Sequence, residues 1–244
     1  STTLIEDCEV ESEIYAVAVG FTSTATVKNC TVTSKDKSYV VFPSSGTIDV
    51  VGGTYEGDLY IYDSSSDSKA SESKIIIDGT LMAGGVDSAG ALATAIAKGG
   101  QITLAKDIAL SETLTVSKDV VIDLNGYNLD ASSNTSRPFN VSGGKLTING
   151  GTSNIKVGKY GFVNIPVGSD AEVVLNGGNY TGNTDNGSFL KPRGEGKIVL
   201  RLNGVNYTDS SDDGYVINLA NYDGTDIQTY VDGGTYSAAA GINV

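Results

Sequence analysis

Histidine and tryptophan are both absent from this chain of 244 residues, which also holds only two cysteines, one methionine and four prolines. Without histidine the chain lacks the commonest general base and the commonest metal ligand of proteins. Two cysteines are too few for the disulfide framework of a small secreted domain. No run of about 18 apolar residues occurs, so no segment is predicted to span a membrane.

Basic residues are scarce as well, since 16 Lys and Arg stand against 29 Asp and Glu and give a net charge of −13. Nucleic-acid binding needs a basic surplus that neutralises phosphates, and docking on an anionic membrane needs clusters of Lys and Arg. We therefore expect no nucleic-acid partner and no membrane insertion. The hydrophobic fraction of 39% argues against a disordered chain.

One phrase recurs at spacings of 22 to 29 residues: a β-branched residue or Leu, then Asn, Asp or Gly, then Gly or Cys, and soon a Tyr, Val or Leu. Its copies occupy residues 4–10, 26–32, 50–55, 76–81, 124–129, 148–152, 175–180, 202–207 and 231–236. A coil of three short strands and three turns needs about that many residues. Alternating apolar runs between the phrases are typical of half-buried strands. The sequence thus predicts an all-β fold, a right-handed parallel β-helix.

In such a solenoid, equivalent residues of successive coils stack in ladders. Asn and Gly at the corner of the phrase permit the left-handed backbone of a sharp turn. The inward positions predict a mixed ladder of Tyr55, Tyr180, Tyr207 and Tyr236 with Val10, Val32 and Leu129. Cys8 and Cys30 fall at equivalent places on adjacent coils. We expect them to be buried small side chains, with a disulfide or a reactive pair as alternatives.

The segment 88–98 interrupts the strand pattern and predicts a short helix. Ser88 is a suitable N-cap, Leu92 and Ile96 share one face, and Gly99 suits the C-terminal cap. An amphipathic helix can cover the exposed end of a solenoid. We therefore divide the chain into β-helix coils at 1–86 and a β-helix with an N-terminal capping helix at 87–244, forming one continuous solenoid.

Residues 92–129, with Ala-Ile-Ala-Lys-Gly-Gly-Gln-Ile-Thr-Leu from Ala95 and Val-Val-Ile-Asp-Leu-Asn-Gly-Tyr-Asn-Leu from Val120, resemble the opening of bacterial right-handed parallel β-helix proteins of the pectin-lyase-like superfamily. The Asn-Gly and Asp-Gly phrases extend the resemblance over most of the chain. The resemblance implies a secreted or cell-surface protein that acts on or adheres to polysaccharide. The fold itself leaves the function open.

The resemblance also indicates which residues to consider for catalysis. Hydrolases of the superfamily carry Asp-rich motifs and a His-Gly, and this chain, which has no histidine, offers only Asp212 and Asp213 as paired carboxylates. The lyases use calcium and an Arg or Lys base, for which Lys191 and Arg193 are the candidates. Both sets look first like residues of solvated loops, and the chain is expected to be non-catalytic.

Binding and metal candidates come from the same segments. Lys191 and Arg193 face one side of an extended stretch and can clamp an acidic sugar, while Tyr215 and Tyr222 are aromatic rings on which a sugar can stack. Candidate calcium ligands are Asp209, Asp213, Asp223 and Asp226, together with the loop from Asp63 to Asp67; ordinary Asp-rich turns are the alternative. No other cofactor is indicated.

We therefore predict a non-catalytic, adhesin-like or glycan-binding bacterial β-helix protein, secreted or on the cell surface, whose partner is a polysaccharide or a host surface glycan. Two alternatives remain. One is a polysaccharide lyase or hydrolase of the same superfamily. The other is a structural filament or phage fibre module assembled end to end. It is suggested by the coil repeat, whose spacing continues when Ser1 of one copy is placed after Val244 of another.

Overall fold

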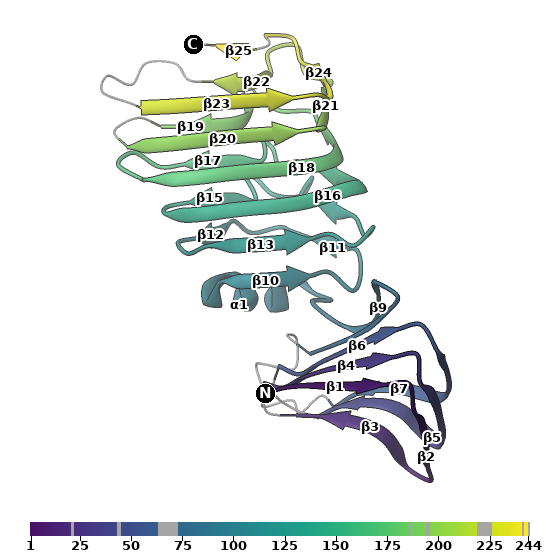
Figure 1. Cartoon of the computed structure of the whole chain (residues 1–244). Coiled ribbons are helices and arrows are strands. Elements are labelled where there is room, and N and C mark those ends of the chain that lie inside the picture. Colours follow the sequence, from purple (N-terminus) through teal and green to yellow (C-terminus); the bar gives the residue numbers. More distant parts are fainter. Residues whose placement is uncertain are drawn as a thin grey trace. The chain divides into compact units, whose positions relative to one another are not determined.

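A computed structural model describes residues 1–20, 22–42, 45–62, 73–185, 187–193, 196–218, 226–240 and 242–243. The chain divides into two compact units, unit 1 (Ser1–Val86) and unit 2 (Asp87–Val244). Strands make up 60% of the structure and wind into a parallel β-solenoid of about eight turns, which confirms the predicted fold class (Figure 1). The handedness of the winding stays a prediction.

Unit 1 has two sheets whose strands alternate along the chain. One sheet holds β1 (Thr2–Glu6), β4 (Thr24–Lys28), β6 (Thr47–Val51), β8 (Lys74–Ile77) and β9 (Thr80–Gly84) in that order. The other holds β2 (Glu9–Ser12) and β3 (Tyr15–Val19) on one side of β5 (Thr31–Val41), with β7 (Thr54–Ile61) on its other side. All of these pairs are parallel except β8 with β9, which form an antiparallel hairpin.

The corner residues of unit 1 have the left-handed backbone that the phrase predicts. Asp7, Asn29, Gly52 and Asp78 have φ of 52°, 51°, 63° and 48° and occupy the corners of four successive windings. Backbone bonds link these corners: the Asp7 N–H donates to the carbonyl of Lys28, and the Asn29 N–H to that of Val51. Asn and Asp tolerate this conformation better than other residues with a side chain, which is why they recur there.

The core of unit 1 is made of small and β-branched side chains with one aromatic ring. Its buried members are Val17, Val27, Cys30, Val32, Tyr39, Val41, Ile48, Val50 and Ile75. Val10, Val32 and Tyr55 are in register, as predicted. The Tyr55 ring lies 5.7 Å from that of the buried Tyr39, but Tyr55 is nevertheless 38% exposed, because β7 pairs with β5 alone among the described strands.

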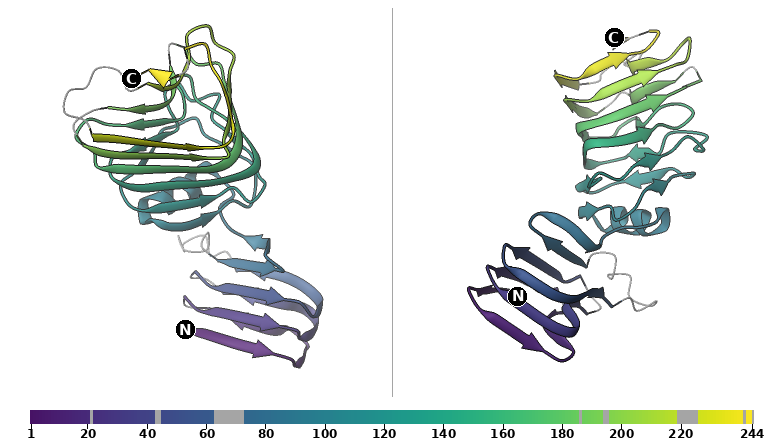
Figure 2. Two further views of the ribbon diagram at one scale, coloured as in Figure 1. Left: turned by 45° about the horizontal axis from the view of Figure 1, so that its top comes forward. Right: turned by 90° about the vertical axis from the view of Figure 1, so that its right-hand side faces the viewer.

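Unit 2 repeats the coil over two larger sheets (Figures 1 and 2). The 10-stranded sheet holds β10 (Gly100–Thr103), β11 (Ile108–Ala109), β13 (Val120–Asp123), β14 (Leu129–Asp130), β16 (Gly144–Lys156), β18 (Ala171–Gly182), β20 (Lys197–Asn203), β21 (Asn206–Asp209), β23 (Asp226–Asp232) and β24 (Thr235–Ser237). The 6-stranded sheet holds β12 (Leu114–Val116), β15 (Phe139–Val141), β17 (Val163–Ile165), β19 (Ser188–Pro192), β22 (Tyr215–Asn218) and β25 (Ile242–Asn243). Every pair of these strands is parallel, and the register between β16 and β18 shifts between Asn149 and Asn154.

Helix α1 (Ala89–Lys98) opens unit 2 and matches the predicted cap. The hydroxyl of Ser88 accepts the N–H of Ala91, and the Gly99 N–H bonds back to the carbonyls of Ala95 and Ile96. Leu92, Ala95 and Ile96 are buried, and the helix packs on β10 and β12, the first strands of their sheets. The helix thereby covers core side chains that an open first coil would expose to water.

A ladder of apolar and aromatic residues runs through the interior of unit 2, as predicted. Ile108, Leu129, Ile155, Tyr180, Tyr207 and Tyr236 are partners on successive strands. Tyr180 and Tyr207 are 1% and 0% exposed, whereas Tyr236 in the last strand of the ladder is half-buried. Phe162 and Phe189 pack against these tyrosines with ring centroids 4.3–5.1 Å apart, so the interior is a stack of aromatic rings.

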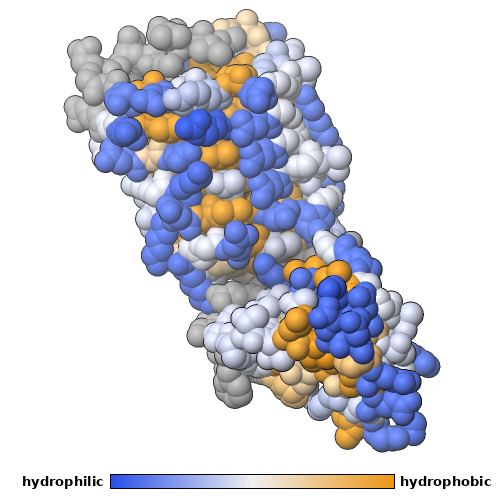
Figure 3. Space-filling model, viewed as in Figure 1, coloured by the Kyte–Doolittle hydropathy of each residue, from blue (hydrophilic) through white to orange (hydrophobic). Residues whose placement is uncertain are grey.

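Polar ladders cover the outside of the same coils. Asn149, Asn176 and Asn203 pass a hydrogen bond from amide to amide at 2.9 and 2.8 Å along the 10-stranded sheet. On the face of unit 2 seen in Figure 3, hydrophilic residues alternate with smaller hydrophobic patches. This surface follows from the period-two pattern of each strand, in which inward apolar and outward polar residues alternate.

Candidate functional site

Three successive segments stack at one corner of unit 2, at residues 134–137, at 158–161, and at 184–185 with 187–188. The Tyr160 N–H donates to the carbonyl of Ser136 at 3.1 Å, and the Ser188 N–H donates to the carbonyl of Tyr160 at 3.1 Å. The packing leaves no room for a side chain at Gly161, where a Cβ atom would lie 1.8 Å from the Ser188 carbonyl oxygen. The close stacking of these segments therefore fixes the backbone from which their side chains project.

Arg137, in the first of these turns, is an unusual core residue because it is only 8% exposed. One terminal nitrogen of its guanidinium lies 3.4 Å from the hydroxyl of Ser188, and its Nε has no hydrogen-bond partner. Burial and the nearby charge of Arg193 lower the pKa of Arg137 to about 10. The group is still a cation at neutral pH, so a buried positive charge stands here without full compensation.

Lys191, on β19, and Arg193, directly after it, lie near Arg137. Burial and the charges of Arg137 and Arg193 lower the pKa of Lys191. Lys191 is half-buried and Arg193 is exposed. We name Arg137, Lys191 and Arg193 the cationic cluster.

The cationic cluster has no acidic partner among the residues that the structure describes, where ion pairs join other Lys and Arg residues to carboxylates. The chain has a net charge of −13, yet these three neighbouring cations form no ion pair with any carboxylate that the structure describes. Mutual repulsion and desolvation both make such a group costly for the fold, and both costs fall when an anion binds.

Tyr160 lies beside the cationic cluster, and Tyr215 lies on the strand that follows β19 in the sheet. Tyr160 is 38% exposed, its ring lies 5.4 Å from the Lys159 ammonium, and its hydroxyl interacts electrostatically with Arg137. Tyr215 is half-buried on β22 and is the register partner of Ser188. Of the four predicted binding residues, Lys191 and Tyr215 thus lie on the neighbouring strands β19 and β22, and Arg193 directly follows β19. Tyr222 lies outside the described residues.

Asp209 is buried and accepts four hydrogen bonds. The Tyr207 and Thr184 hydroxyls lie 2.6 and 2.7 Å from Oδ2, and the Thr184 and Ser211 N–H groups lie 3.2 and 2.9 Å from Oδ1. Burial raises the pKa of Asp209, but these donors outweigh it and hold the pKa below its usual range. The carboxylate therefore fixes the turn after β21 from inside.

The other acidic candidates are spread over this end of unit 2. Asp212 and Asp213 are exposed in the turn after β21, and Asp226 is exposed at the start of β23, opposite Lys197. Asp223 and the loop 63–67 lie outside the described residues. Within the described part of the chain, no three Asp, Glu, Cys or His side chains are grouped as a metal site would require. The calcium site stays a prediction.

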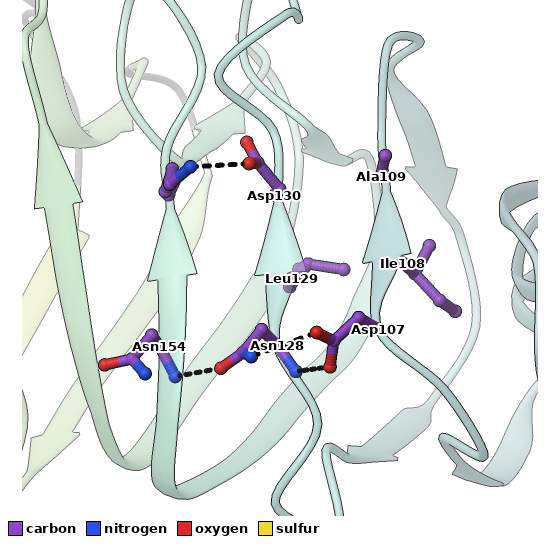
Figure 4. A pocket seen from close by; sticks show the side chains of 8 residues that line it. Asp107, Ile108, Ala109, Asn128, Leu129, Asp130 and Asn154 are labelled. Carbon is purple, nitrogen blue, oxygen red and sulfur yellow. Dashed lines mark hydrogen bonds and ion pairs between the residues drawn. The ribbon is translucent and has the colours of Figure 1, made fainter.

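A separate hollow of about 380 Å³ lies on the 10-stranded sheet around β11, β14 and the end of β16 (Figure 4). Asp107, Asn128 and Asn154 lie side by side along its edge on successive coils. Asp107 accepts the backbone N–H and the side-chain amide of Asn128 at 2.8 and 3.1 Å, and Asn128 accepts the Asn154 N–H at 3.0 Å. The two bonds from Asn128 lower the pKa of Asp107.

At the other end of the hollow, Lys156 bonds to Asp130 at 2.8 Å. Burial raises the pKa of Asp130, but Lys156 and Ser132 outweigh that effect and lower it to about 2. The polar groups of the hollow thus bond mainly to one another, in contrast to the cationic cluster. A ligand there would have to break these bonds.

No protein-family model, curated protein or solved structure matches this chain. No helix in the described part of the chain has the length and apolar character needed to cross a bilayer.

Sequence reasoning missed Arg137, which completes the cationic cluster. A signal for it exists, because Arg137 lies two residues before Phe139 and shares the inward parity of Phe139 and Val141 on β15. A charged residue at an inward position of a strand pattern is the kind of local conflict that marks functional sites.

Proposed function

We propose that this protein is a secreted or surface-exposed bacterial β-helix, related to the pectin-lyase-like superfamily, that binds an acidic polysaccharide through the cationic cluster of unit 2. The observation that carries the proposal is Arg137 beside Lys191 and Arg193: it is nine-tenths buried, charged at neutral pH and without a carboxylate partner among the described residues. A carboxylate or sulfate group of a sugar would supply the missing negative charge.

The surroundings favour a sugar over a free anion. Tyr160 presents a partly exposed ring next to the cationic cluster, and such rings stack against the apolar faces of sugars. Half-buried amides lie on the same sheet as Lys191: Asn164, the register partner of Lys191, donates to Asn140 at 2.7 Å, and such amides can bond hydroxyl groups. A long solenoid face with one charged contact point suits a chain of sugars of which at least one is acidic.

The test is binding to polygalacturonate, with dextran as the neutral polymer. The double variant Lys191→Gln and Arg193→Gln is expected to weaken polygalacturonate binding about tenfold or more, since charge-assisted bonds are lost. The matched control Lys35→Gln and Lys106→Gln removes the same charge from exposed sites and is expected to bind as wild type does. Equal weakening in both variants would reduce the effect to overall charge and contradict a site.

Arg137 allows a second test, because binding and stability should change in opposite directions. Replacing a buried, uncompensated charge by an apolar side chain of similar length is neutral or stabilising. Arg137→Met is therefore expected to keep or raise the thermal midpoint while polygalacturonate binding is lost. A loss of stability with unchanged binding would make Arg137 a structural residue and refute the proposal.

A lyase is the second candidate, and the lowered pKa of Lys191 favours it. An amine that releases its proton more readily can act as the base that abstracts the proton beside a uronate carboxylate. The same incubations, with and without calcium, reveal this activity as unsaturated chain ends. Cleavage that is lost in Lys191→Gln would establish the enzyme, whereas retention of the polymer without new ends supports the binding protein.

A further inference from the structure

The two cysteines of the chain meet at one corner of unit 1. Cys8 lies between β1 and β2, and Cys30 lies between β4 and β5, one coil further along. The Thr31 N–H donates to the carbonyl of Cys8 at 3.0 Å, and Glu9 and Thr31 are register partners. The two thiols therefore occupy the same place on adjacent coils of a parallel ladder.

Their sulfur atoms are in contact. The Sγ atoms of Cys8 and Cys30 are 3.2 Å apart, and both cysteines are present as free thiols. Neighbouring parallel strands lie about 4.8 Å apart, which falls within the Cα separation of about 4.4–6.8 Å that a disulfide requires. A bond between the sulfurs thus needs no displacement of the coils.

Access to the two thiols differs. Cys30 is 2% exposed and its thiol also lies 3.3 Å from the carbonyl of Lys28, whereas Cys8 is half-buried. The equivalent corner of the third coil carries Gly53, where a Cβ atom would lie 2.2 Å from the Cys30 carbonyl oxygen. The ladder is thereby limited to one pair of thiols, of which Cys8 is the one that a reagent reaches.

We propose that Cys8 and Cys30 are a redox pair whose oxidation joins the first two coils of unit 1 by a disulfide. With a small disulfide such as oxidised glutathione, the Cys8 thiolate attacks one sulfur and expels a glutathione thiolate. The Cys30 thiolate then attacks the Cys8 sulfur of the mixed disulfide and expels the second. The protein loses two hydrogens, two molecules of reduced glutathione form, and the new bond closes a loop that encloses one complete coil.

The experiment treats the whole protein with oxidised glutathione under mildly alkaline conditions. Intact mass and free-thiol titration after denaturation measure the products. Wild type is expected to lose two hydrogens and both thiols as a monomer and to gain thermal stability, because the cross-link restricts the unfolded chain. Free thiols in wild type after prolonged incubation, a lasting glutathione adduct or a disulfide-linked dimer would each overturn the proposal.

Single variants test the order of the steps. Cys30→Ser removes the resolving thiol, so glutathione is expected to remain on Cys8 as a stable adduct. Cys8→Ser leaves only the buried thiol, and we expect it to remain unmodified while the fold persists. Rapid modification of Cys30 in the Cys8→Ser variant, with an unchanged circular dichroism spectrum, would contradict the geometry on which the pair depends. The result does not depend on the polysaccharide proposal, because all the residues involved lie in unit 1.

Discussion

Unit 1 and unit 2 have the same corner phrase but differ in how their coils are filled. Unit 1 packs small and β-branched side chains around Tyr39, and its buried cluster includes a thiol, Cys30. Unit 2 packs a continuous aromatic stack in which Phe189 contacts the rings of Phe162, Tyr180 and Tyr207. A repeated corner thus sets the coil path, while the residues between corners decide how much apolar area each coil buries.

The units differ also at their first strands. In unit 2, helix α1 covers the first coil and buries Leu92 and Ile96. In unit 1, the first strand, β1, leaves the inward Ile5 only partly buried, whereas its register partner Val27 on the next coil is 0% exposed. Because each coil of a solenoid is stabilised mainly by its neighbours, an uncovered coil is expected to be the least stable part of its unit.

The largest loss of stability is expected from Phe189→Ala in unit 2. Phe189 is 0% exposed and lies 4.3 Å from the Tyr207 ring, so its loss leaves a cavity in the stack and costs about 3–5 kcal/mol. Urea unfolding followed by circular dichroism measures the loss. The two cysteines lie only in unit 1, so the urea dependence of thiol labelling reports separately on that unit.

The labelling experiment tests whether the two units are stabilised separately. If the units are stabilised by separate cores, Phe189→Ala lowers the circular dichroism midpoint and leaves the labelling midpoint of Cys30 unchanged. An equal shift of both midpoints would mean that the two regions unfold as one cooperative unit. Conversely, Tyr39→Ala in unit 1 should shift the labelling midpoint most.

A smaller loss of stability, similar in both units, is expected when the corner glycines Gly53 and Gly234 are replaced by alanine. They have φ of +81° and +83°, and a Cβ atom on them would lie 2.2 and 2.0 Å from the carbonyl oxygens of Cys30 and Val205. Gly53→Ala and Gly234→Ala are expected to cost about 2–3 kcal/mol each, from backbone strain and from separation of adjacent coils. Urea midpoints of each variant measure this cost.

Gly204→Ala is the matched control for the corner glycines. Gly204 also has a positive φ, +63°, but a Cβ atom there would meet nothing within 4 Å. Only the left-handed strain of about 1–2 kcal/mol should remain. If the control lost as much stability as Gly234→Ala, strain alone would explain both, and close stacking of the corners would not contribute.

The coil, its corners and the capping helix were predictable from the sequence because each depends on a local pattern. The left-handed corner at Asn29 follows from residue type, and the N-cap at Ser88 follows from spacing. The exposure of Tyr55 and the burial of Arg137 were not predictable from the sequence, since both depend on which strand lies next in space. Lys191 and Arg193 were proposed as a clamp from their spacing, and that role stays a prediction; the desolvation of Lys191 could not be predicted, because it exists only in the folded coil.

The smallest expected effect is on the pH dependence of the stability of unit 2, and it arises from the bond between Lys156 and Asp130. The pKa of Asp130 is about 2 in the folded chain, below the value of about 3.9 in an unfolded one. A lowered folded pKa contributes stability above pH 4 that is lost as the pH falls from about 4 to 2. Lys156→Met removes one of the groups that lower this pKa, so stability at neutral pH should fall slightly and its decline between pH 4 and 2 should become shallower. Urea midpoints of unit 2 across this range test it, with Lys106→Met as the control for loss of a surface cation. A decline as steep in Lys156→Met as in wild type would mean that the bond at 2.8 Å does not set the titration of Asp130.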